Sequence, residues 1–261
     1  MIQASAVTKV VRGHKGQPIE ILSPIDLEVR PGEFVALVGP SGCGKSTLLN
    51  ILSGLIEPSS GSVSIFDRTP EQNRSRIGYM FQTDALLPWR SVLRNVQAGL
   101  DLSGVPRAES RQRAQDMLAQ LGLTGFEHHY PAELSGGMRQ RASLARTWVT
   151  NPNLILMDEP FGALDSQTKL VIQSSFLLFW EKHRKTVVLV THDLEEAVAM
   201  SDRVLVMSAR PGKIKAEYRI ELPRPRSVID LRADRKFIDY WRSIWGDLET
   251  EAVQAMQGLS T

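Results

Sequence analysis

Eight consecutive residues, Gly39 to Ser46, have the types and spacing of a loop that binds phosphate. They read Gly-Pro-Ser-Gly-Cys-Gly-Lys-Ser and match the pattern G-x-x-x-x-G-K-[ST]. The glycines let the backbone curl so that successive N–H groups converge on one anion, and the positive end of a following helix adds to the attraction. Lys45 is then placed for the β- and γ-phosphates of a nucleotide, and Ser46 for a Mg²⁺ ion.

Two carboxylates follow a separate apolar run. Leu154 to Met157 leads directly into Asp158 and Glu159, so a buried strand is predicted to end in two acids. Ligands of open α/β sheets bind at the carboxyl ends of the strands. Asp158 is therefore a candidate ligand for Mg²⁺, and Glu159 is a candidate general base for the water that attacks a γ-phosphate. An acidic pair alone often only caps a helix, but the phosphate loop in the same chain favours the catalytic interpretation.

The composition is that of an ordinary globular protein. The chain has 261 residues, 42% of them hydrophobic and 23% charged, which excludes disordered and collagen-like classes. We find no apolar stretch near the roughly 18 to 20 residues that span a bilayer and no secretory signal, so we expect the chain to stay in the cytosol. The single cysteine, Cys43, cannot form an internal disulfide. Because it occupies a variable position of the phosphate loop, we interpret it as a small filler rather than a nucleophile.

Positive charge is concentrated toward the C-terminus. The net charge is +2, but the span from Arg203 to Arg242 carries eleven basic and five acidic residues, which leaves about −4 for the rest. Such a stretch is typical of a solvated face, and it is also compatible with binding to nucleic acid or to an anionic membrane surface.

Alternating strands and helices must position these motifs. Apolar runs predict strands over Phe34 to Val38, Leu154 to Met157, Thr186 to Val190 and Val204 to Met207, with helices from Lys45 and over Ser166 to about Arg184. This alternation is typical of a largely parallel sheet covered by helices.

A helical insert and a terminal helix complete the pattern. Between Val92 and Leu123, apolar residues recur at the spacing of a helix with one buried face, namely Ala114, Met117, Leu118 and Leu121. The segment Leu222 to Arg226 has two prolines and is interpreted as a linker. Beyond it, one face of a terminal helix is predicted to carry Phe237, Trp241, Ile244 and Leu248.

A third motif runs from Leu134 to Arg141 and reads Leu-Ser-Gly-Gly-Met-Arg-Gln-Arg. Its place between the phosphate loop and the acidic strand closely resembles the signature sequence of ATP-binding cassette (ABC) ATPases. Gln82 resembles the Q-loop glutamine of that family, Asp165 resembles the D-loop aspartate, and His192 resembles the switch histidine. Six motifs in one order are far more specific than any one of them.

The resemblance covers nearly the whole chain and implies its fold and its site. The fold is α/β, a P-loop NTPase of the ABC ATPase type, with an antiparallel β subdomain and a helical signature subdomain over about 91–150. The ATPase domain spans 1–221, and 222–261 form the linker and an amphipathic helix on or near it. The implied catalytic residues are Glu159, His192 and Lys45, the metal ligands are Ser46, Gln82 and Asp158, and the ATP contacts are Gly39, Pro40, Ser41, Gly42, Cys43, Gly44, Lys45, Ser46, Thr47 and Gln82.

The start of the signature helix forms a second anion site, from Ser135, Gly136 and Gly137. One subunit has no use for two sites on one γ-phosphate. The resemblance therefore implies that these residues contact ATP on a second nucleotide-binding domain, identical or homologous, and that Asp165 lies at that dimer interface. ATP binding would close the dimer, and hydrolysis would release it.

One position departs from the family pattern. Members usually stack the adenine on an aromatic residue of the first strand, where this chain has Val11. We therefore leave the selectivity for ATP over GTP open, with His14 as an alternative contact.

Two kinds of cassette ATPase are compatible with these motifs. The apolar stretch from Asp84 to Trp89 is stiffened by a proline and is interpreted as a docking site for a permease helix, with Leu87, Pro88 and Trp89 as its contacts. Together with Asn95-Val96, Ser201 to Val204, Ser208 to Gly212 and Leu222 to Arg226, it resembles the importers for nitrate, sulfonates and taurine. This resemblance implies transmembrane permease subunits, a periplasmic solute-binding protein and a location on the cytoplasmic face of the plasma membrane. The alternative is a soluble ABC ATPase that acts in cofactor assembly or on nucleic acid. Its support is the basic stretch, but sustained heptads and a second cassette are missing from the sequence, so we expect no nucleic-acid partner.

Overall fold

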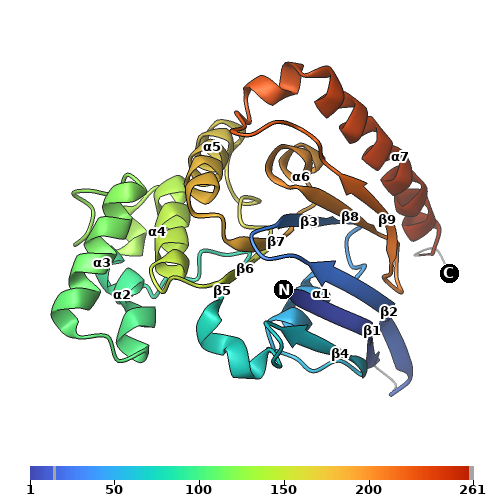
Figure 1. The fold of residues 1–261 in the computed structure, drawn as a ribbon, viewed down its shortest axis with the longest axis horizontal. Helices are drawn as coiled ribbons and strands as arrows, with labels where there is room; N and C mark the ends of the chain where they lie inside the picture. Colours follow the sequence, from blue (N-terminus) through green and yellow to red (C-terminus); the bar gives the residue numbers. More distant parts are fainter. Residues whose placement is uncertain (14–15, 259–261) are drawn as a thin grey trace.

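The computed structural model describes residues 1–13 and 16–258 (Figure 1). Its strands form two sheets. The larger sheet has the order β5-β6-β7-β3-β8-β9, with bounds Ile77–Met80, Leu154–Asp158, Thr186–Val190, Phe34–Val38, Arg203–Met207 and Ile214–Arg219. The smaller sheet is antiparallel in the order β2-β1-β4, with bounds Pro18–Val29, Ile2–Arg12 and Ser60–Ile65.

The helices gather in three places around these sheets (Figure 1). A separate lobe holds α2, α3 and α4, the helices α5 and α6 pack on the larger sheet, and α7 runs along its β9 edge. None of the helices in the described ranges is both long and apolar enough to cross a membrane. The bounds of α1 to α7 are Lys45–Leu52, Val92–Leu102, Arg107–Gln120, Gly136–Trp148, Ser166–His183, Leu194–Met200 and Arg235–Gly258, and short 3₁₀ turns cover Glu71–Arg76, Pro131–Glu133 and Asp230–Ala233.

The four central strands of the larger sheet, β6, β7, β3 and β8, are buried on both faces, which explains why each contains a continuous apolar run. β3 pairs in parallel with β7 on one side and β8 on the other. Because successive side chains point to opposite faces, Phe34, Ala36 and Val38 pack in one core with residues of α5 and α6, whereas Val35 and Leu37 pack in a second core with α1 and the smaller sheet. Strands covered on both faces lose the polar alternation of a half-exposed sheet.

The predicted α/β class is confirmed, and so are the four central strands. β5, β6, β7, β3 and β8 are all parallel, and only β9 pairs antiparallel, with β8. Their carboxyl ends therefore lie along one edge of the sheet. The phosphate loop follows β3, the acidic pair ends β6, and His192 follows β7.

The C-terminal part is fastened to the sheet more firmly than a linker would be. The segment Leu222 to Arg226 forms no helix or strand, as its prolines predict, but Arg226 is only 4% exposed. Its guanidinium donates to four carbonyl oxygens, those of Ala199, Ser201, Ile220 and Leu222. Beyond this segment α7 packs on α6, β8 and β9, with Phe237 and Ile244 buried.

Truncation of Trp180 tests the core between β3 and α5. Trp180 is fully buried, its ring packs edge-on against Phe34 at 5.2 Å between centroids, and its indole N–H donates to the Lys185 carbonyl over 2.7 Å. W180A is expected to lower the free energy of unfolding by about 3–5 kcal/mol, because it leaves a large cavity. Urea unfolding measures this. The control on the same helix is L178A, at a side chain that is 60% exposed, with an expected change within about 0.5 kcal/mol. Equal losses in the two variants would contradict this account.

Candidate functional site

The phosphate loop is held in its curved shape by backbone geometry and by its own lysine. Gly44, the last residue before α1, has a left-handed backbone with φ of 105°, and a Cβ there would lie 2.5 Å from Leu22 Cδ2. Only glycine fits this position. The Lys45 side chain is 7% exposed, and its Nζ donates to the carbonyl oxygens of Gly39 over 2.7 Å and Pro40 over 2.9 Å. The ammonium group therefore lies inside the curve of the loop, where a bound phosphate would add to its partners.

Oxygen donors from two motifs meet beside this loop. The Ser46 hydroxyl donates to Asp158 Oδ1 over 2.9 Å. Burial raises the pKa of the Asp158 carboxyl, and the nearby Glu159 acts in the same direction, whereas the bond from Ser46 and the charge of Lys45 oppose the rise. A hydroxyl beside a carboxylate is a donor set that suits a hard cation.

Glu159 lies where three motifs converge. Its Oε2 is 3.0 Å from Nδ1 of His192 and accepts a long hydrogen bond of 3.4 Å from Nε2 of Gln82. Its backbone is left-handed, with φ of 46°, and its N–H donates to the Val190 carbonyl over 2.9 Å. A non-glycine residue in this conformation costs about 1–2 kcal/mol, and such strain is common at functional sites. The carboxylate thus has one neighbour from the end of β5 and one from the end of β7.

These residues line one cleft. Its volume is about 590 Å³, and its walls include Lys45, Ser46, Gln82, Glu159 and His192. Motifs separated by up to about 150 residues therefore lie together at one cleft. The remaining walls are Val11, Ile21, Ser41, Gly42, Gly44, Thr47 and Arg210.

The cleft includes two residues to which the sequence reasoning gave no site role. Ile21 belongs to β2, and Arg210 follows β8. No local pattern marks either of them as a site residue, because only the folding of distant strands places them at the cleft. Val11 does line the cleft, whereas His14 lies outside the described residues.

The signature residues lie at the start of α4 and outside this cleft. The Ser135 hydroxyl caps the helix by accepting from the Met138 N–H over 3.3 Å. A Cβ on Gly137 would lie 2.6 Å from Thr168 Cγ2, so the approach of α5 requires this glycine. A Cβ on Gly136 would meet nothing closer than 3.8 Å. Packing within the described residues therefore explains why position 137 is a glycine, but it does not explain the glycine at position 136.

Asp165 caps the neighbouring helix α5. Its Oδ1 accepts from the Thr168 N–H over 3.0 Å, and this bond lowers the pKa of the Asp165 carboxyl. The cap alone is a sufficient structural reason for an aspartate here, so its role at a dimer interface stays a prediction.

The segment predicted to dock a permease is an exposed turn on a rigid support. Trp89 is 72% exposed, Pro88 is exposed and Leu87 is half-buried. The fully buried Asn95 fixes the turn, because its side chain accepts from the Leu87 N–H over 2.7 Å and donates to the Arg90 carbonyl over 2.9 Å.

Two arginines of the signature helix hold the residues before this turn. Arg146 donates to the carbonyl oxygens of Asp84 and Ala85. Arg139 pairs with the Asp84 carboxylate over 3.1 Å. The segment after Gln82 is therefore fastened to α4, a connection that spans 55 or more residues and that no local pattern indicates.

Comparison with known proteins gives a consistent result. The ABC transporter family matches residues 22–162. An uncharacterized ABC transporter ATP-binding protein of Methanocaldococcus jannaschii is 42% identical over 256 residues, 98% of this chain and 94% of that protein. The taurine import ATP-binding protein TauB of Rhizobium johnstonii is 44% identical over 209 residues, 80% of each chain.

Solved structures show the same likeness. A dimeric structure of the ABC transporter cassette MJ0796 superposes with a TM-score of 0.75 and 35% identity, over 85% of this chain and all of that one. The same cassette in a post-hydrolysis state, bound to ADP and Pi, gives a TM-score of 0.75 at 34% identity with the same coverage.

The raised pKa of Asp158 leads to a prediction about the stability of the fold. A raised pKa means that Asp158 stabilises the fold most below the ordinary pKa of an aspartate, and that this contribution is lost as the pH rises through the raised pKa. At pH 7 the charged form therefore costs stability. D158N, which keeps an oxygen for Ser46, is expected to raise the melting temperature at pH 7 without Mg²⁺ or nucleotide by up to about 2–4 °C.

D165N is the matched control with the opposite sign. The pKa of Asp165 is lowered, so this carboxylate stabilises the fold above its ordinary pKa and loses that contribution only as the pH falls through the lowered value. D165N should therefore lower the melting temperature at pH 7. A melting temperature of D158N that is unchanged or lower at pH 7 would show that the burial of the Asp158 carboxylate is not a cost.

Proposed function

Because the chain belongs to the ABC transporter ATP-binding family and is an ATPase, we propose that it powers an importer for a small solute of the nitrate, sulfonate or taurine type. The convergence of Gln82, Glu159 and His192 in one cleft with the phosphate loop carries the proposal. The solute class rests on relatives named as taurine import ATP-binding proteins, at 41–44% identity.

In the proposed mechanism the chain binds and orients, and one carboxylate takes a proton. The loop amides and Lys45 bind the phosphates of ATP. Glu159 accepts the proton of the attacking water, and its contacts to His192 and Gln82 fix the position of its carboxylate. His192 also stabilises the charge that develops on the γ-phosphate.

The residues beside the phosphate loop include suitable ligands for Mg²⁺. Ser46, Asp158 and Gln82 supply hydroxyl, carboxylate and amide oxygens, and within the described ranges we find no group of three or more His, Cys, Asp or Glu residues that would form a cage for a metal. Mg²⁺ is commonly held in this way, by one or two protein ligands together with substrate phosphates. When bound, it neutralises charge on the phosphate oxygens.

A second nucleotide-binding domain completes the proposed unit. Gly136 lies at a helix start where no neighbour among the described residues excludes a side chain, as expected if the γ-phosphate of a partner domain approaches there. The dimeric structure of MJ0796 supports such an assembly. The signature residues Ser135, Gly136 and Gly137, together with Asp165, would then face that partner.

We further propose that Leu87, Pro88 and Trp89 dock a transmembrane permease on the cytoplasmic face of the plasma membrane, with a periplasmic solute-binding protein delivering the solute. A large aromatic residue exposed on a turn that a buried asparagine fixes is a suitable anchor for a partner helix. In this proposal residues 1–221 form the ATPase domain, with a helical subdomain over about 91–150, and 222–261 pack on or near it.

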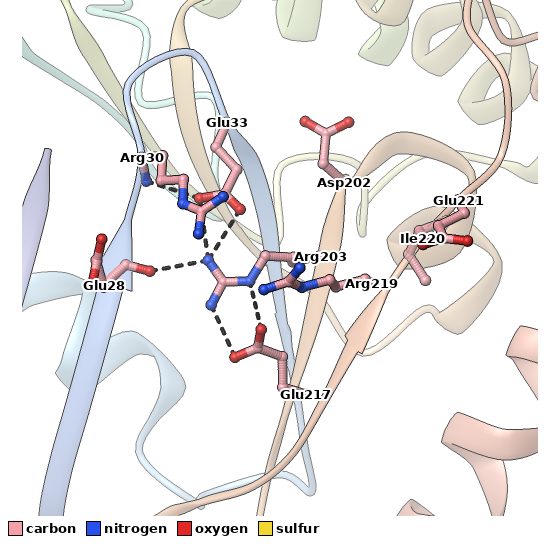
Figure 2. A pocket seen from close by; sticks show the side chains of 9 residues that line it. All are labelled: Glu28, Arg30, Glu33, Asp202, Arg203, Glu217, Arg219, Ile220 and Glu221. Carbon is pink, nitrogen blue, oxygen red and sulfur yellow. Dashed lines mark hydrogen bonds and ion pairs between the residues drawn. The ribbon is translucent and has the colours of Figure 1, made fainter.

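The structure weakens the main argument for a nucleic-acid partner. Figure 2 shows Arg203 between Glu33 and Glu217, with which it forms ion pairs of 3.0 and 2.9 Å. Arg224 pairs with Glu181 and Asp202, and Arg226 is buried. These three cations of the basic stretch are therefore neutralised or enclosed and do not form a free surface for phosphates.

Substitution of Glu159 tests the mechanism. E159Q should lower the rate of ATP hydrolysis at least about 100-fold, because an amide cannot accept the proton. ATP binding should persist, and size-exclusion chromatography with ATP should show a trapped dimer. The control E109Q changes a surface pair with Arg113 in α3 and should keep the full rate. A rate above about a tenth of the wild-type rate in E159Q would show that Glu159 is not the general base. Unchanged ATP affinity in K45A would contradict the assignment of Gly39 to Ser46 as the phosphate-binding loop.

Substitution of Trp89 tests the transport role. Tagged chain purified from native membranes is expected to retain a polytopic membrane protein, identified by mass spectrometry. W89A should lose most of that partner and keep its ATP affinity, because the side chain is 72% exposed and outside the cleft. The control L102A changes a residue of the same lobe that is 91% exposed. A complex with RNA or only soluble proteins, unaffected by W89A, would overturn the transporter assignment and leave the ATPase assignment intact.

A further inference from the structure

The loop after β8 lies directly against the phosphate loop. We call Ser208 to Lys213 the β8–β9 loop. A Cβ on Gly212 would lie 2.0 Å from the carbonyl oxygen of Cys43, so the two loops are in contact at this glycine. Gly212 also donates to the Ile21 carbonyl over 2.9 Å and accepts from the Ser23 N–H over 3.1 Å. The β8–β9 loop is thus packed between the phosphate loop and β2.

The terminal helix α7 holds the same loop from the other side. Glu251, 7% exposed, accepts a hydrogen bond of 2.8 Å from the Ala209 N–H through Oε2, and its Oε1 pairs with Lys215 over 3.1 Å. The Ser208 hydroxyl accepts from the Lys213 N–H over 3.1 Å and closes the loop. Residues on both sides of Arg210 are therefore fixed, Ala209 by α7 and Gly212 by the phosphate loop.

Arg210 extends from this fixed loop into the cleft. It is exposed, it lines the cleft with the phosphate loop and Val11, and no hydrogen bond or ion pair joins its guanidinium to another residue in the part of the chain that the structure describes. A planar cation without a partner, on a rigid support, is available for a ligand.

The order of the strands shows which end of the nucleotide Arg210 would meet. Glu159 and His192 follow β6 and β7, on one side of β3. Arg210 follows β8, on the opposite side of β3, where Ile21 and Val11 also line the cleft. A nucleotide with its phosphates on the loop after β3 and its γ-phosphate toward Glu159 would therefore direct its nucleoside toward Arg210.

We propose that Arg210 stacks its guanidinium on the base of the bound nucleotide, and that α7 keeps it in place through Glu251. The inference rests on the nucleotide site proposed above. Guanidinium planes stack on aromatic rings, and nucleobases are held in this way where a protein offers arginine in place of an aromatic side chain. Val11 has no ring with which to supply that contact. Because every base presents a π-face, the contact discriminates weakly between ATP and GTP.

Two ligands separate a base contact from a charge effect. The full chain is titrated by calorimetry with Mg-ATP and with inorganic tripolyphosphate, which has phosphates and no base. R210A is expected to weaken ATP binding about tenfold and to change tripolyphosphate binding by less than about twofold. R210K, which keeps the charge and loses the plane, should resemble R210A. The control K213A removes a cation of the same loop that does not line the cleft, and it should bind both ligands as the wild type does.

The possible results have distinct meanings. Wild-type affinity for ATP in R210A overturns the proposal, and so does an equal loss for ATP and tripolyphosphate, since that would be a phosphate contact. K45A should weaken the binding of both ligands, because Lys45 is a phosphate contact in the proposed site. If K45A binds both normally, the nucleotide site itself is wrong and this inference fails with it. If K45A loses both ligands while R210A loses neither, only the role of Arg210 fails.

A double-mutant cycle tests Glu251 as a positioning residue. E251A should weaken ATP binding in the wild-type background and have no further effect in R210A. E251Q keeps an oxygen acceptor for Ala209 and should restore most of the affinity. A lower melting temperature in E251A with unchanged ATP affinity would show that α7 only stabilises the fold, and would overturn its part of the proposal.

Discussion

The register of the parallel strands is the constraint on which the site depends. Val190 on β7 lies opposite Leu37 on β3 and opposite Asp158 on β6. This alignment places the start of the phosphate loop, the acidic pair and the residues before His192 at the same level of the sheet. The hydrogen bonds that continue past the strands, from Glu159 N–H to the Val190 carbonyl and from Thr191 N–H to the Leu37 carbonyl, extend the alignment into the loops. A slip of one residue would turn each apolar side chain to the opposite face, and would separate the carboxylates from the loop.

Residues whose roles depend on local pattern could be predicted from the sequence, and residues whose roles depend on distant contacts could not. Each central strand contains a run of four or five apolar residues, and Gly39 to Ser46 is a contiguous motif, so both can be recognised in the sequence itself. Gly137 follows the signature pattern, but the reason that a glycine is needed there is Thr168 on another helix. The role proposed for Arg210 depends in the same way on a distant contact, the bond from the Ala209 N–H to Glu251, 42 residues away. The ion pairs of the basic stretch could not be predicted for the same reason, because a carboxylate partner of Arg203 lies 170 residues away.

Polar contacts join the segment after Gln82 to the helical lobe in addition to apolar packing. The helical lobe meets the segment after Gln82 through Arg139 and Arg146, both on the helix that begins with the signature residues. The exposed turn around Trp89 and the start of α4 are therefore parts of one hydrogen-bonded unit. A displacement of that turn by a partner would be transmitted to α4 through directed bonds, which tolerate less sliding than apolar contacts do.

The left-handed backbone at Glu159 affects which substitutions selection would favour at this position. Glycine adopts this conformation without steric cost, and asparagine adopts it more readily than glutamate. Glutamate at position 159 therefore adds backbone strain that a glycine there would not add. Selection for heat resistance without selection for turnover would favour replacement of this glutamate. Under the proposed role of Glu159 as the general base, persistence of glutamate in a lineage would therefore record continued use of the reaction and not the needs of the fold.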